Sequence, residues 1–362
     1  MTIIVIGAGV VGCAVAHELA SRGARVRIVD PRGTGQGATR ASAGILAPTI
    51  EGHVPALLDL GSRSLALYDE FVERVAADAG APIEYDRSGT LQVALDAGEA
   101  ESLCALARTF GEAGIEHRLM GPDEARTLER AVPDETVNAL FVPQHGYVAV
   151  GALTRTLARA AIKRGATLTI ATVQRVEGGT TPAVATDQME FASEADAVVI
   201  ASGSWTDQIV GTSATVRPIR GQLLQLRLPH RPASRVIWGR RCYAVPWRDG
   251  AVLLGATVED AGFDENATAA GVQELLSEGF RLLPALREAA FDEVRVGLRP
   301  MTRDELPAIG PSSTMRNVFY ATGHYRNGVL LAPLTAKLIA DLVLDRRESP
   351  ELAMLQPSRL GL

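Results

Sequence analysis

Three glycines near the beginning of the chain have a spacing that suits phosphate binding. Gly7, Gly9 and Gly12 form a G-x-G-x-x-G pattern. The first glycine lets the chain turn sharply, the second lets a pyrophosphate approach the backbone, and the third lets a helix pack closely on a strand. Asp30 follows at the distance expected for a carboxylate that accepts hydrogen bonds from a ribose 2′-hydroxyl, which disfavours a 2′-phosphate. The chemistry that these residue types predict is the binding of a dinucleotide.

The glycine pattern needs a strand before it and a helix after it, and the sequence predicts both. Residues 2–6 (TIIVI) form a short β-branched, apolar run, which is typical of a strand buried on both faces. A helical stretch follows to Arg22, where Gly23 can take the left-handed conformation that ends a helix. Its N-terminus offers N–H groups and a positive dipole end to phosphates. Residues 24–29 form a second apolar run. A glycine-rich structural turn is the alternative, and this stretch does not decide between FAD and NAD.

Two further loops are rich in small residues and are expected near the same ligand. Residues 33–44 (GTGQGATRASAG) are too polar for a core, and their Ser, Thr and backbone N–H groups can wrap a pyrophosphate. A plain surface loop would have the same composition. Residues 197–201 form an apolar run that enters a turn at residues 202–205, where Gly203 allows the backbone to approach a ligand closely.

Size, charge and cysteine content indicate an ordinary globular protein of the cytoplasm. The chain has 362 residues, a formal net charge of −6 and a hydrophobic fraction of 47%, and the acidic balance argues against nucleic acid as a partner. Cys13, Cys104 and Cys242 are widely spaced, which indicates reduced thiols. The N-terminus lacks the basic region of a signal peptide, and no run approaches the ~18 apolar residues of a membrane span. No cluster has metal-ligand spacing.

The strand–helix pattern of a nucleotide-binding fold occurs in three separated segments. It stops near residue 82, resumes near residue 146, and resumes once more near residue 300. The elements expected in these segments are a long amphipathic helix over residues 55–77, a helix over 152–164, a strand over 167–176, a strand over 317–321 and a C-terminal helix to residue 344.

The two intervening stretches predict a second unit with antiparallel strands. The elements expected there are strands over residues 90–94, 139–142, 217–228 and 293–299, helices over 99–113, 122–128 and 272–283, and a hairpin of 242–247 with 251–257. We therefore expect an α/β fold in which a Rossmann-type domain (residues 1–82, 146–214 and 300–362) carries an inserted α+β domain (residues 83–145 and 215–299) built on an antiparallel sheet.

Several short motifs along the whole chain carry a resemblance to a known family. Besides the N-terminal glycines, they are residues 43–46 (AGIL), 220–222 (RGQ), 242–243 (CY) with Pro246, 255–257 (GAT), 297–300 (GLRP) and 323–328 (GHYRNG). Together they resemble the FAD-dependent D-amino-acid oxidase superfamily, and within it the glycine oxidases of thiamine biosynthesis. The last two motifs are the most specific. Two positions depart from some relatives, since Val258 stands where they carry Met and Arg241 where they carry His, which leaves the substrate range open.

The resemblance implies a site, carried over residue by residue. Arg299 would clamp a substrate carboxylate through two parallel charge-assisted hydrogen bonds, Tyr243 would hold the same carboxylate by its phenol, and Arg326 would lie in the pocket beside the flavin. Without the motif, Arg299 would be interpreted as part of a solvated strand face. The residues implied to contact FAD are Gly7, Gly9, Val10, Val11, Gly12, Asp30, Ala38, Thr39, Ala43, Gly44, Ile45, Val173, Gly203, Gly323, His324, Tyr325, Arg326, Asn327, Gly328, Val329 and Leu330.

The resemblance also implies the reaction. It is the oxidation of glycine and other small amines or D-amino acids, such as sarcosine and D-alanine, by hydride transfer from the α-carbon to flavin N5. Oxygen is reduced to hydrogen peroxide, and the imine hydrolyses to glyoxylate and ammonia or supplies the thiazole of thiamine. No catalytic base is implied, because His324 beside a cofactor loop is more often structural. The FAD is expected to be non-covalent, since residues 300–330 contain no cysteine.

The implied partners are a small amino acid, oxygen, a functional link to thiazole synthase and further copies of the chain, as a tetramer in the family. One alternative is a D-amino-acid or secondary-amine dehydrogenase of the same fold with a different electron acceptor. Another is a flavin-bearing module of a tRNA-modifying assembly, against which the acidic charge argues.

Overall fold

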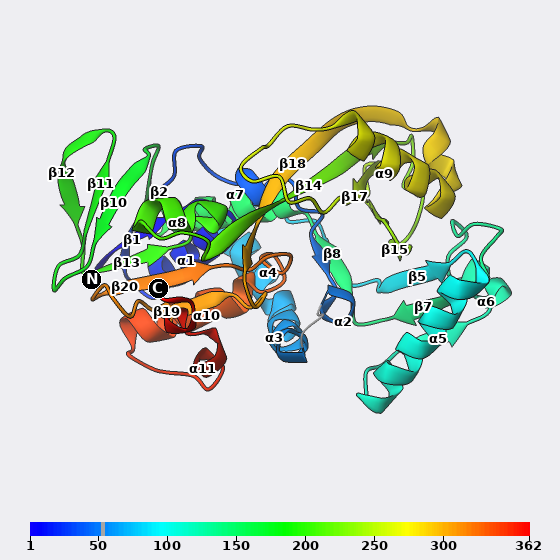
Figure 1. Cartoon of the computed structure of the whole chain (residues 1–362), viewed down its shortest axis with the longest axis horizontal. Coiled ribbons are helices and arrows are strands. Elements are labelled where there is room, and N and C mark those ends of the chain that lie inside the picture. Colours follow the sequence, from blue (N-terminus) through cyan, green and yellow to red (C-terminus); the bar gives the residue numbers. More distant parts are fainter. Residues whose placement is uncertain (52–54) are drawn as a thin grey trace.

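Two large β-sheets organise the protein, and they use different parts of the chain (Figure 1). The computed structural model describes residues 1–51 and 55–362. The first sheet has the strand order β19-β20-β13-β1-β2-β9, in which β20 to β9 run parallel and β19 is antiparallel at one edge. Its strands are β1 (Thr2–Ile6), β2 (Arg25–Val29), β9 (Thr167–Thr169), β13 (Ala197–Ile200), β19 (Ala308–Pro311) and β20 (Val318–Thr322). Three separate segments therefore build one mostly parallel sheet, and the predicted fold class is confirmed.

Strand β1 at the centre of this sheet is buried on both faces, as its sequence predicts. Ile3 and Val5 pack among the helices, whereas Ile4 and Ile6 belong to a second core cluster on the opposite face. Alternate side chains of a strand point to opposite faces, so a run without polar residues must be covered twice. On the helical face, α1 packs between α7 and α10, and α7 packs on α4. These helices are α1 (Val10–Ser21), α4 (Tyr68–Ala79), α7 (Val150–Lys163) and α10 (Ala332–Leu344).

The opposite face is covered by a small antiparallel sheet and short helical pieces. Val173, Val176 and Val184 of the small sheet pack in the same cluster as Ile4 and Ile6. Figure 1 shows this sheet projecting at one end of the molecule. The elements on this side are β10 (Val173–Glu177), β11 (Ala183–Thr186), β12 (Met189–Glu194) and α8 (Thr206–Val210). Helix α11 (Leu352–Leu355) instead packs in the core cluster of the helical face.

The second large sheet is almost entirely antiparallel and has the order β18-β14-β17-β16-β15-β5-β7-β6, with β15 and β5 as a parallel pair. Helix α9 packs on β14, β16 and β17, and α5 packs on β5 and β7. Its elements are β5 (Thr90–Ala94), α5 (Ala97–Glu112), β6 (Arg118–Met120), α6 (Pro122–Leu128), β7 (Asn138–Val142), β14 (Val216–Arg227), β15 (Val236–Trp238), β16 (Tyr243–Pro246), β17 (Ala251–Gly255), α9 (Ala269–Leu282) and β18 (Ala290–Thr302). The predicted hairpin is β16–β17.

A third sheet, made of three short strands, connects the two large sheets. It consists of β3 (Ile45–Leu46), β8 (Gly146–Val148) and β4 (Tyr85–Asp86). Tyr147 on β8 is fully buried, and its hydroxyl donates to the carbonyl of Pro246 on β16 at 3.0 Å. A buried tyrosine needs such a partner for its hydroxyl, and here the bond joins this small sheet to the antiparallel one.

Two of the predicted elements are each divided into two. The helix expected over residues 55–77 is two helices, α3 (Pro55–Ala66) and α4, that meet at Leu67. The sequence around Leu67 contains no Gly or Pro that would predict this break. On its two sides, the hydroxyl of Ser64 donates to the Leu330 carbonyl at 2.7 Å and that of Tyr68 donates to the Val329 carbonyl at 2.6 Å. The break therefore serves a contact with a segment more than 250 residues away, which local sequence cannot reveal.

The strand expected over residues 167–176 is also two strands. β9 pairs with β2 in the parallel sheet, whereas β10 pairs with β11 in the small antiparallel sheet. Residues 170–172 carry the chain from one sheet to the other. Both halves are β-rich in composition, so their sequence predicts strand but not the change of partner.

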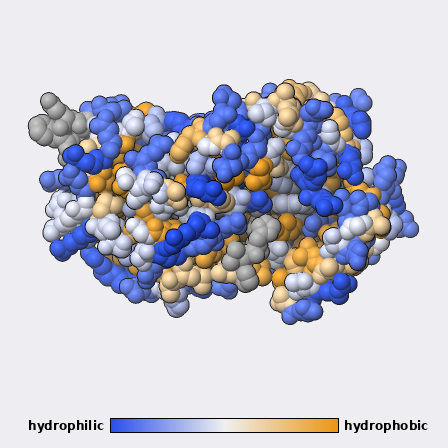
Figure 2. Space-filling view, viewed as in Figure 1, coloured by the Kyte–Doolittle hydropathy of each residue, from blue (hydrophilic) through white to orange (hydrophobic). Residues whose placement is uncertain are grey.

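On the face seen in Figure 2, apolar residues occur in small groups between hydrophilic ones. The longest helix of the described chain, α5, has 16 residues. No helix within residues 1–51 and 55–362 combines the length and hydropathy that crossing a bilayer requires.

Candidate functional site

A cavity of about 380 Å³ lies between the two large sheets. One end is lined by residues that follow the carboxyl ends of β1, β2, β13 and β20, which is where open parallel sheets bind ligands. The other end is lined by residues of β16, β17 and β18 from the antiparallel sheet. A single ligand in this cavity would therefore contact both sheets.

The glycine turn between β1 and α1 forms the first end of the cavity. Gly7 has φ +110°, and a Cβ there would lie 2.4 Å from the carbonyl oxygen of Ala201. A Cβ at Gly12 would lie 2.0 Å from the carbonyl oxygen of Gly7. Gly12 therefore serves helix–strand packing, as predicted, and does not itself line the cavity. The backbone N–H of Val10 donates to Thr39 Oγ1 at 3.0 Å, which ties the 33–44 loop to the start of α1.

Asp30 lies at the end of β2 on the wall of this cavity. Its Oδ2 accepts from the N–H of Ala8 at 2.9 Å, and its Oδ1 accepts from the N–H of Arg32 at 2.8 Å. An ionised carboxylate has about four acceptor positions, so Asp30 fixes the glycine turn and keeps capacity for a ligand hydroxyl.

An aromatic and charged group lies beside Asp30 and was not predicted. The guanidinium carbon of Arg32 is 4.2 Å from the ring centroid of Trp205, and Arg32 also pairs with Glu265 at 2.9 Å. Trp205 in turn contacts Phe263, with 5.9 Å between ring centroids. The loop after β17 thus reaches across to the parallel sheet. Arg32 and Glu265 are 233 residues apart, so no local signal could have joined them.

The loop at residues 323–331 contributes to the cavity wall. Tyr325 has φ +48°, and its N–H donates to the Pro300 carbonyl at 2.8 Å. His324 is 2% exposed, with Nε2 3.0 Å from Thr335 Oγ1. Burial lowers the pKa of His324 to about 3. Its imidazole is therefore neutral at physiological pH and is a weak base.

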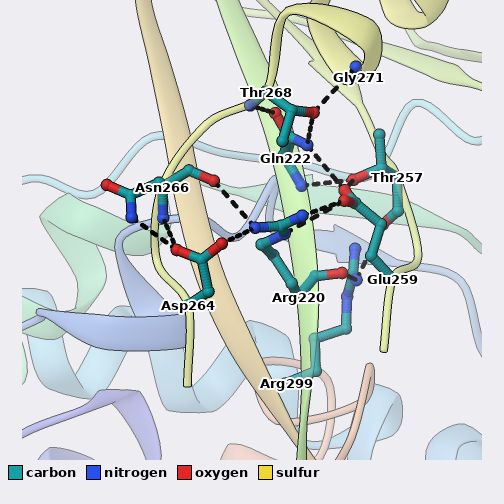
Figure 3. A network of polar contacts seen from close by, with 9 residues as sticks. All are labelled: Arg220, Gln222, Thr257, Glu259, Asp264, Asn266, Thr268, Gly271 and Arg299. Atoms are coloured by element: carbon teal, nitrogen blue, oxygen red, sulfur yellow. Dashed lines mark hydrogen bonds and ion pairs between the residues drawn. The ribbon is translucent and has the colours of Figure 1, made fainter. Parts of the chain in front are cut away.

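Arg299 and Tyr243 line the second end of the cavity. Arg299 Nη1 donates to the carbonyl of Thr257 at 3.0 Å and to that of Arg220 at 3.3 Å (Figure 3). Among the described residues these are the partners of its guanidinium, so Nη2 and Nε are left for a ligand. Tyr243 on β16 packs against Trp238, with ring centroids 5.0 Å apart, and a Cβ at Gly255 would lie 2.8 Å from its hydroxyl.

The structure brings most of the predicted site residues to this one cavity, including all three assigned to the substrate. Those that line it are Gly7, Gly9, Val10, Val11, Asp30, Ala38, Thr39, Ala43, Gly44, Ile45, Gly203, Tyr243, Arg299, His324, Tyr325, Arg326, Gly328 and Val329. Gly12, Val173, Gly323, Asn327 and Leu330 are not on its wall. Contact of these residues with a ligand remains a prediction.

The five residues outside the wall have other observed roles. Val173 starts β10 and packs in the core cluster beneath the parallel sheet. Gly323 has φ +74° and lies close to Thr302, whose Cγ2 would be 2.5 Å from an added Cβ. Asn327 and Leu330 supply backbone carbonyls, to the N–H of Leu331 and to Ser64 respectively. These contacts shape the loop that bears His324.

The turn between β15 and β16 places two cations at the cavity. Arg240 and Arg241 both line it, and both are exposed. Arg241 forms an ion pair with Glu274. Arg240 has no ion-pair partner in the part of the chain that the structure describes. Cys242 follows, and burial raises the pKa of its thiol to about 12, which keeps it protonated. No group of three or more His, Cys, Asp or Glu in the described residues could hold a metal ion.

Comparison with known proteins gives one family and close relatives. The family described as FAD dependent oxidoreductase matches residues 2–342. The bifunctional protein ThiO/ThiG of Synechocystis sp. is 34% identical over 99% of this chain and 54% of its own, so the chain spans about half the length of this relative. Glycine oxidase of Geobacillus kaustophilus is 33% identical over 95% of this chain and 93% of its own.

Solved structures agree with these relatives. A crystal structure of glycine oxidase from Geobacillus kaustophilus matches with a TM-score of 0.91 and 32% identity, covering 99% of this chain and 97% of that one. Iminodiacetate oxidase from Chelativorans sp. BNC1 matches with a TM-score of 0.89 and 27% identity over 98% of each chain. The fold of this chain is therefore similar over nearly its whole length to that of these two oxidases.

Proposed function

This chain belongs to the family of FAD-dependent oxidoreductases, and from that premise we propose that it is an oxidase of glycine and related small amino acids. The observation that supports this proposal most strongly is that a single cavity extends from the parallel sheet to the antiparallel sheet. Its first end has a glycine turn and Asp30, and its second end has Arg299 and Tyr243. A dinucleotide with a redox-active ring and a small carboxylate substrate can thus meet between the two sheets.

The residues of the first end fit FAD. Gly9 lines the cavity at the start of α1, and the lack of a side chain there leaves the helix N-terminus open to a pyrophosphate. Asp30 would accept from the ribose hydroxyls. FAD held there would supply a hydride acceptor for the substrate α-carbon and a route for two electrons to oxygen, with hydrogen peroxide as the product.

Non-covalent attachment of the flavin is part of the proposal. Cys242 lines the second end, where burial raises the pKa of its thiol to about 12. Cys13 is buried inside α1, and its thiol donates to the carbonyl of Ala8. The loop beside the cavity, residues 323–331, contains no cysteine. A reactive thiolate at the flavin is therefore not expected.

The second end would bind and orient the substrate. The guanidinium of Arg299 presents Nε and Nη2 for a bidentate pair with the carboxylate, which fixes the direction of the α-carbon. Tyr243 would donate its phenol hydrogen to the same carboxylate, and Arg326 would add positive charge at the mouth. No side chain is needed to remove a proton from carbon, and the low pKa of His324, about 3, suits that role poorly.

A second substrate class is supported by the charge at the mouth. Arg240, Arg241 and Arg326 line the cavity in addition to Arg299, whereas Asp30 supplies the acidic side chain of the lining at the far end. The structural neighbour from Chelativorans is named an iminodiacetate oxidase. An amino acid with a second carboxylate, such as iminodiacetate, would find Arg240 as a partner for that group.

The biological setting is proposed from the relatives and the family. The Synechocystis relative is a bifunctional ThiO/ThiG protein, which supports use of the imine product by thiazole synthase in thiamine biosynthesis. A homo-oligomer, a cytoplasmic location and the division of the chain at residues 83, 146, 215 and 300 are proposals of the same kind. The inserted α+β part would bind the substrate, and the Rossmann-type part would bind FAD.

Spectra and turnover of the purified protein test this function. We expect flavin absorbance and peroxide formation with glycine, sarcosine, D-alanine and iminodiacetate, and little with methylamine. Reduction of a dye without peroxide would favour a dehydrogenase of the same fold. A protein without flavin, or without activity on any amino acid of this panel, would refute the proposal.

A further inference from the structure

A polar network that is buried at Arg220 and Gln222 contacts Arg299 (Figure 3). Arg220 on β14 is 7% exposed and pairs with Glu259 at 2.6 Å and with Asp264. Gln222 is fully buried, and its amide nitrogen donates to Glu259 at 2.7 Å and to Thr268 Oγ1 at 2.9 Å. Charged and amide groups are costly to bury unless each finds partners, and this network satisfies them.

Glu259 is the centre of the network. One of its carboxylate oxygens accepts from Thr257 Oγ1 at 2.5 Å and from Gln222, and the other accepts from Arg220. Its backbone also pairs with that of Arg220, with both N–H···O distances at 2.9 Å. Burial alone would raise the pKa of Glu259, but the hydrogen bonds from Thr257, Gln222 and Arg220 outweigh it and lower the pKa. The carboxylate is thus ionised and held from three sides.

The network ends on Arg299 through two backbone carbonyls. Nη1 of Arg299 donates to the carbonyls of Thr257 and Arg220, the residues that Glu259 binds. The Thr257 backbone is itself fixed by Gln222, whose N–H donates to Thr257 Oγ1 at 2.9 Å and whose carbonyl accepts from the Thr257 N–H at 3.2 Å. Two bonds to one nitrogen define the plane of the guanidinium. The orientation of the edge formed by Nε and Nη2 is then fixed as well.

We propose that Glu259 is a positioning residue that sets the orientation of the Arg299 guanidinium, by holding Thr257 and Arg220 in place, and so determines how well the site binds a carboxylate. The inference rests on the proposed role of Arg299 as the carboxylate clamp. Glu259 itself is not on the cavity wall, so it acts through Arg299. Bidentate recognition depends on the geometry of the fork, and a small rotation of Arg299 would lose one of the two bonds.

The test compares Glu259→Gln with the matched control Asp260→Asn in the FAD-loaded protein. Asp260 is the next residue and pairs with Arg217 at 3.5 Å on the surface. The probe is acetate, titrated calorimetrically, together with kcat and KM for glycine. We expect Glu259→Gln to raise the acetate Kd and the glycine KM by about 5- to 30-fold, and Asp260→Asn to match the parent.

The same substitution in an Arg299→Ala background separates positioning from general structural support. If Glu259 acts through Arg299, Glu259→Gln will cause no further loss of acetate binding once Arg299 is gone. An equal loss in both backgrounds would overturn the inference, as would acetate binding by Glu259→Gln that equals the parent. If Arg299→Ala alone leaves acetate binding unchanged, the proposed clamp fails and the inference fails with it, and this result differs from either of the others.

Thr257→Val gives a second route in case Glu259→Gln does not fold. It removes the hydroxyl that contacts Glu259 and the Gln222 N–H but leaves the carbonyl that contacts Arg299. We expect a weaker acetate affinity that again disappears as an effect in the Arg299→Ala background. Parent-like acetate affinity in Thr257→Val would contradict the proposed link between the network and the clamp.

Discussion

The guanidinium of Arg299 occupies the space that a side chain at Gly221 would need. A Cβ at Gly221 would lie 2.3 Å from Nη1 and 2.4 Å from Cζ and Nη2 of Arg299. Gly221 is on β14, next to β18, where Arg299 pairs with Ile219 two residues away. The glycine of the RGQ motif therefore makes room for the arginine of the GLRP motif. The two motifs are about 80 residues apart in sequence, but the position of Arg299 in one requires the absence of a side chain at Gly221 in the other.

Replacing this glycine should move Arg299 without altering its charge. Gly221→Ala would force the guanidinium away from the Thr257 and Arg220 carbonyls, and overpacking of this kind costs about 1–3 kcal/mol. We expect the glycine KM to rise by about tenfold or more while FAD content is kept. Gly121→Ala is the control, because an added Cβ there meets nothing within 4 Å. A Gly221→Ala variant with the parent's KM would show that the fork tolerates displacement.

Asp30 should matter for FAD affinity and not for the chemistry. Asp30→Asn keeps the size of the side chain but removes one acceptor and the charge. A hydrogen bond to a charged group contributes about 1.5–3 kcal/mol, so FAD should dissociate more readily, while the spectrum of the FAD still bound stays the same. The measurement is the Kd for FAD after removal of the cofactor. Asp196→Asn is the control, since Asp196 also accepts from a backbone N–H of β1, at Thr2, but away from the cavity. If the parent and Asp30→Asn bind FAD with equal affinity, Asp30 does not contact the ribose.

The parts of the site that lie close together in sequence could be predicted, and the distant contacts could not. Gly7, Gly9 and Asp30 belong to one strand–helix–strand unit, whose period and turn chemistry are local. The strand that bears Arg299 was expected over residues 293–299 and extends from Ala290 to Thr302. By contrast, the pair Arg32–Glu265 joins residues 233 apart. Charged residues are common on surfaces, and nothing in their neighbours indicates which of them will meet.

The network around Arg220 is a second case of contacts that could not be predicted from the sequence. The RGQ and GAT motifs were both recognised, but their contact depends on the register of β14 with β17, in which Leu223 pairs with Gly255. Register is fixed by the packing of a whole sheet. The sequence alone therefore does not reveal that the two motifs contact each other. In the folded chain they form one network that supports Arg299.

Denaturation in acid should release the flavin intact. The thiol of Cys242 is protonated at neutral pH because burial raises its pKa to about 12, and no cysteine occurs in residues 323–331. We expect a colourless protein precipitate and FAD in the supernatant, identified by its chromatographic mobility. Yellow colour that remains with the washed precipitate would mean a covalent bond and would contradict the prediction.

Stability should fall as the pH drops below the ordinary pKa of histidine. His145 is 1% exposed and lies 2.8 Å from the hydroxyls of both Thr49 and Thr90, and burial lowers its pKa from 6.5 to about 3. Between those values the unfolded chain binds a proton at this residue and the folded chain does not. The free energy of unfolding therefore decreases toward low pH, by at most ~1.4 kcal/mol per pH unit for this histidine.

His145→Gln removes that titration and should flatten the dependence. Urea unfolding at fixed FAD concentration between pH 4.5 and 7.5 gives the slope for the parent and the variant. His117→Gln is the control, because His117 lies near the surface and its ring contacts Phe110. Identical slopes for the parent and His145→Gln would show that the pKa of His145 is the same in the folded and unfolded states and would contradict the prediction.

The decisive prediction concerns Arg299 itself. Arg299→Lys keeps a positive charge but loses the planar fork, so turnover of glycine should fall although the protein folds and holds FAD. Arg299→Ala should lower kcat/KM for glycine by a factor that corresponds to roughly 2–4 kcal/mol of lost transition-state stabilisation. The reason is that a charge-assisted bidentate pair away from water is among the stronger polar contacts. Arg295→Ala is the control on the same strand, because Arg295 pairs with Glu293 at 2.8 Å and does not line the cavity.

An amine without a carboxylate decides whether the loss belongs to the clamp. Methylamine should be a poor substrate for the parent, and its kcat/KM should change little in Arg299→Lys and Arg299→Ala, because it has no group for the fork to bind. Structural damage at β18 would instead lower the rates with glycine and methylamine by the same factor. That equal loss would assign Arg299 to the support of the sheet, and the carboxylate-bearing substrate class proposed for this protein would have to be abandoned.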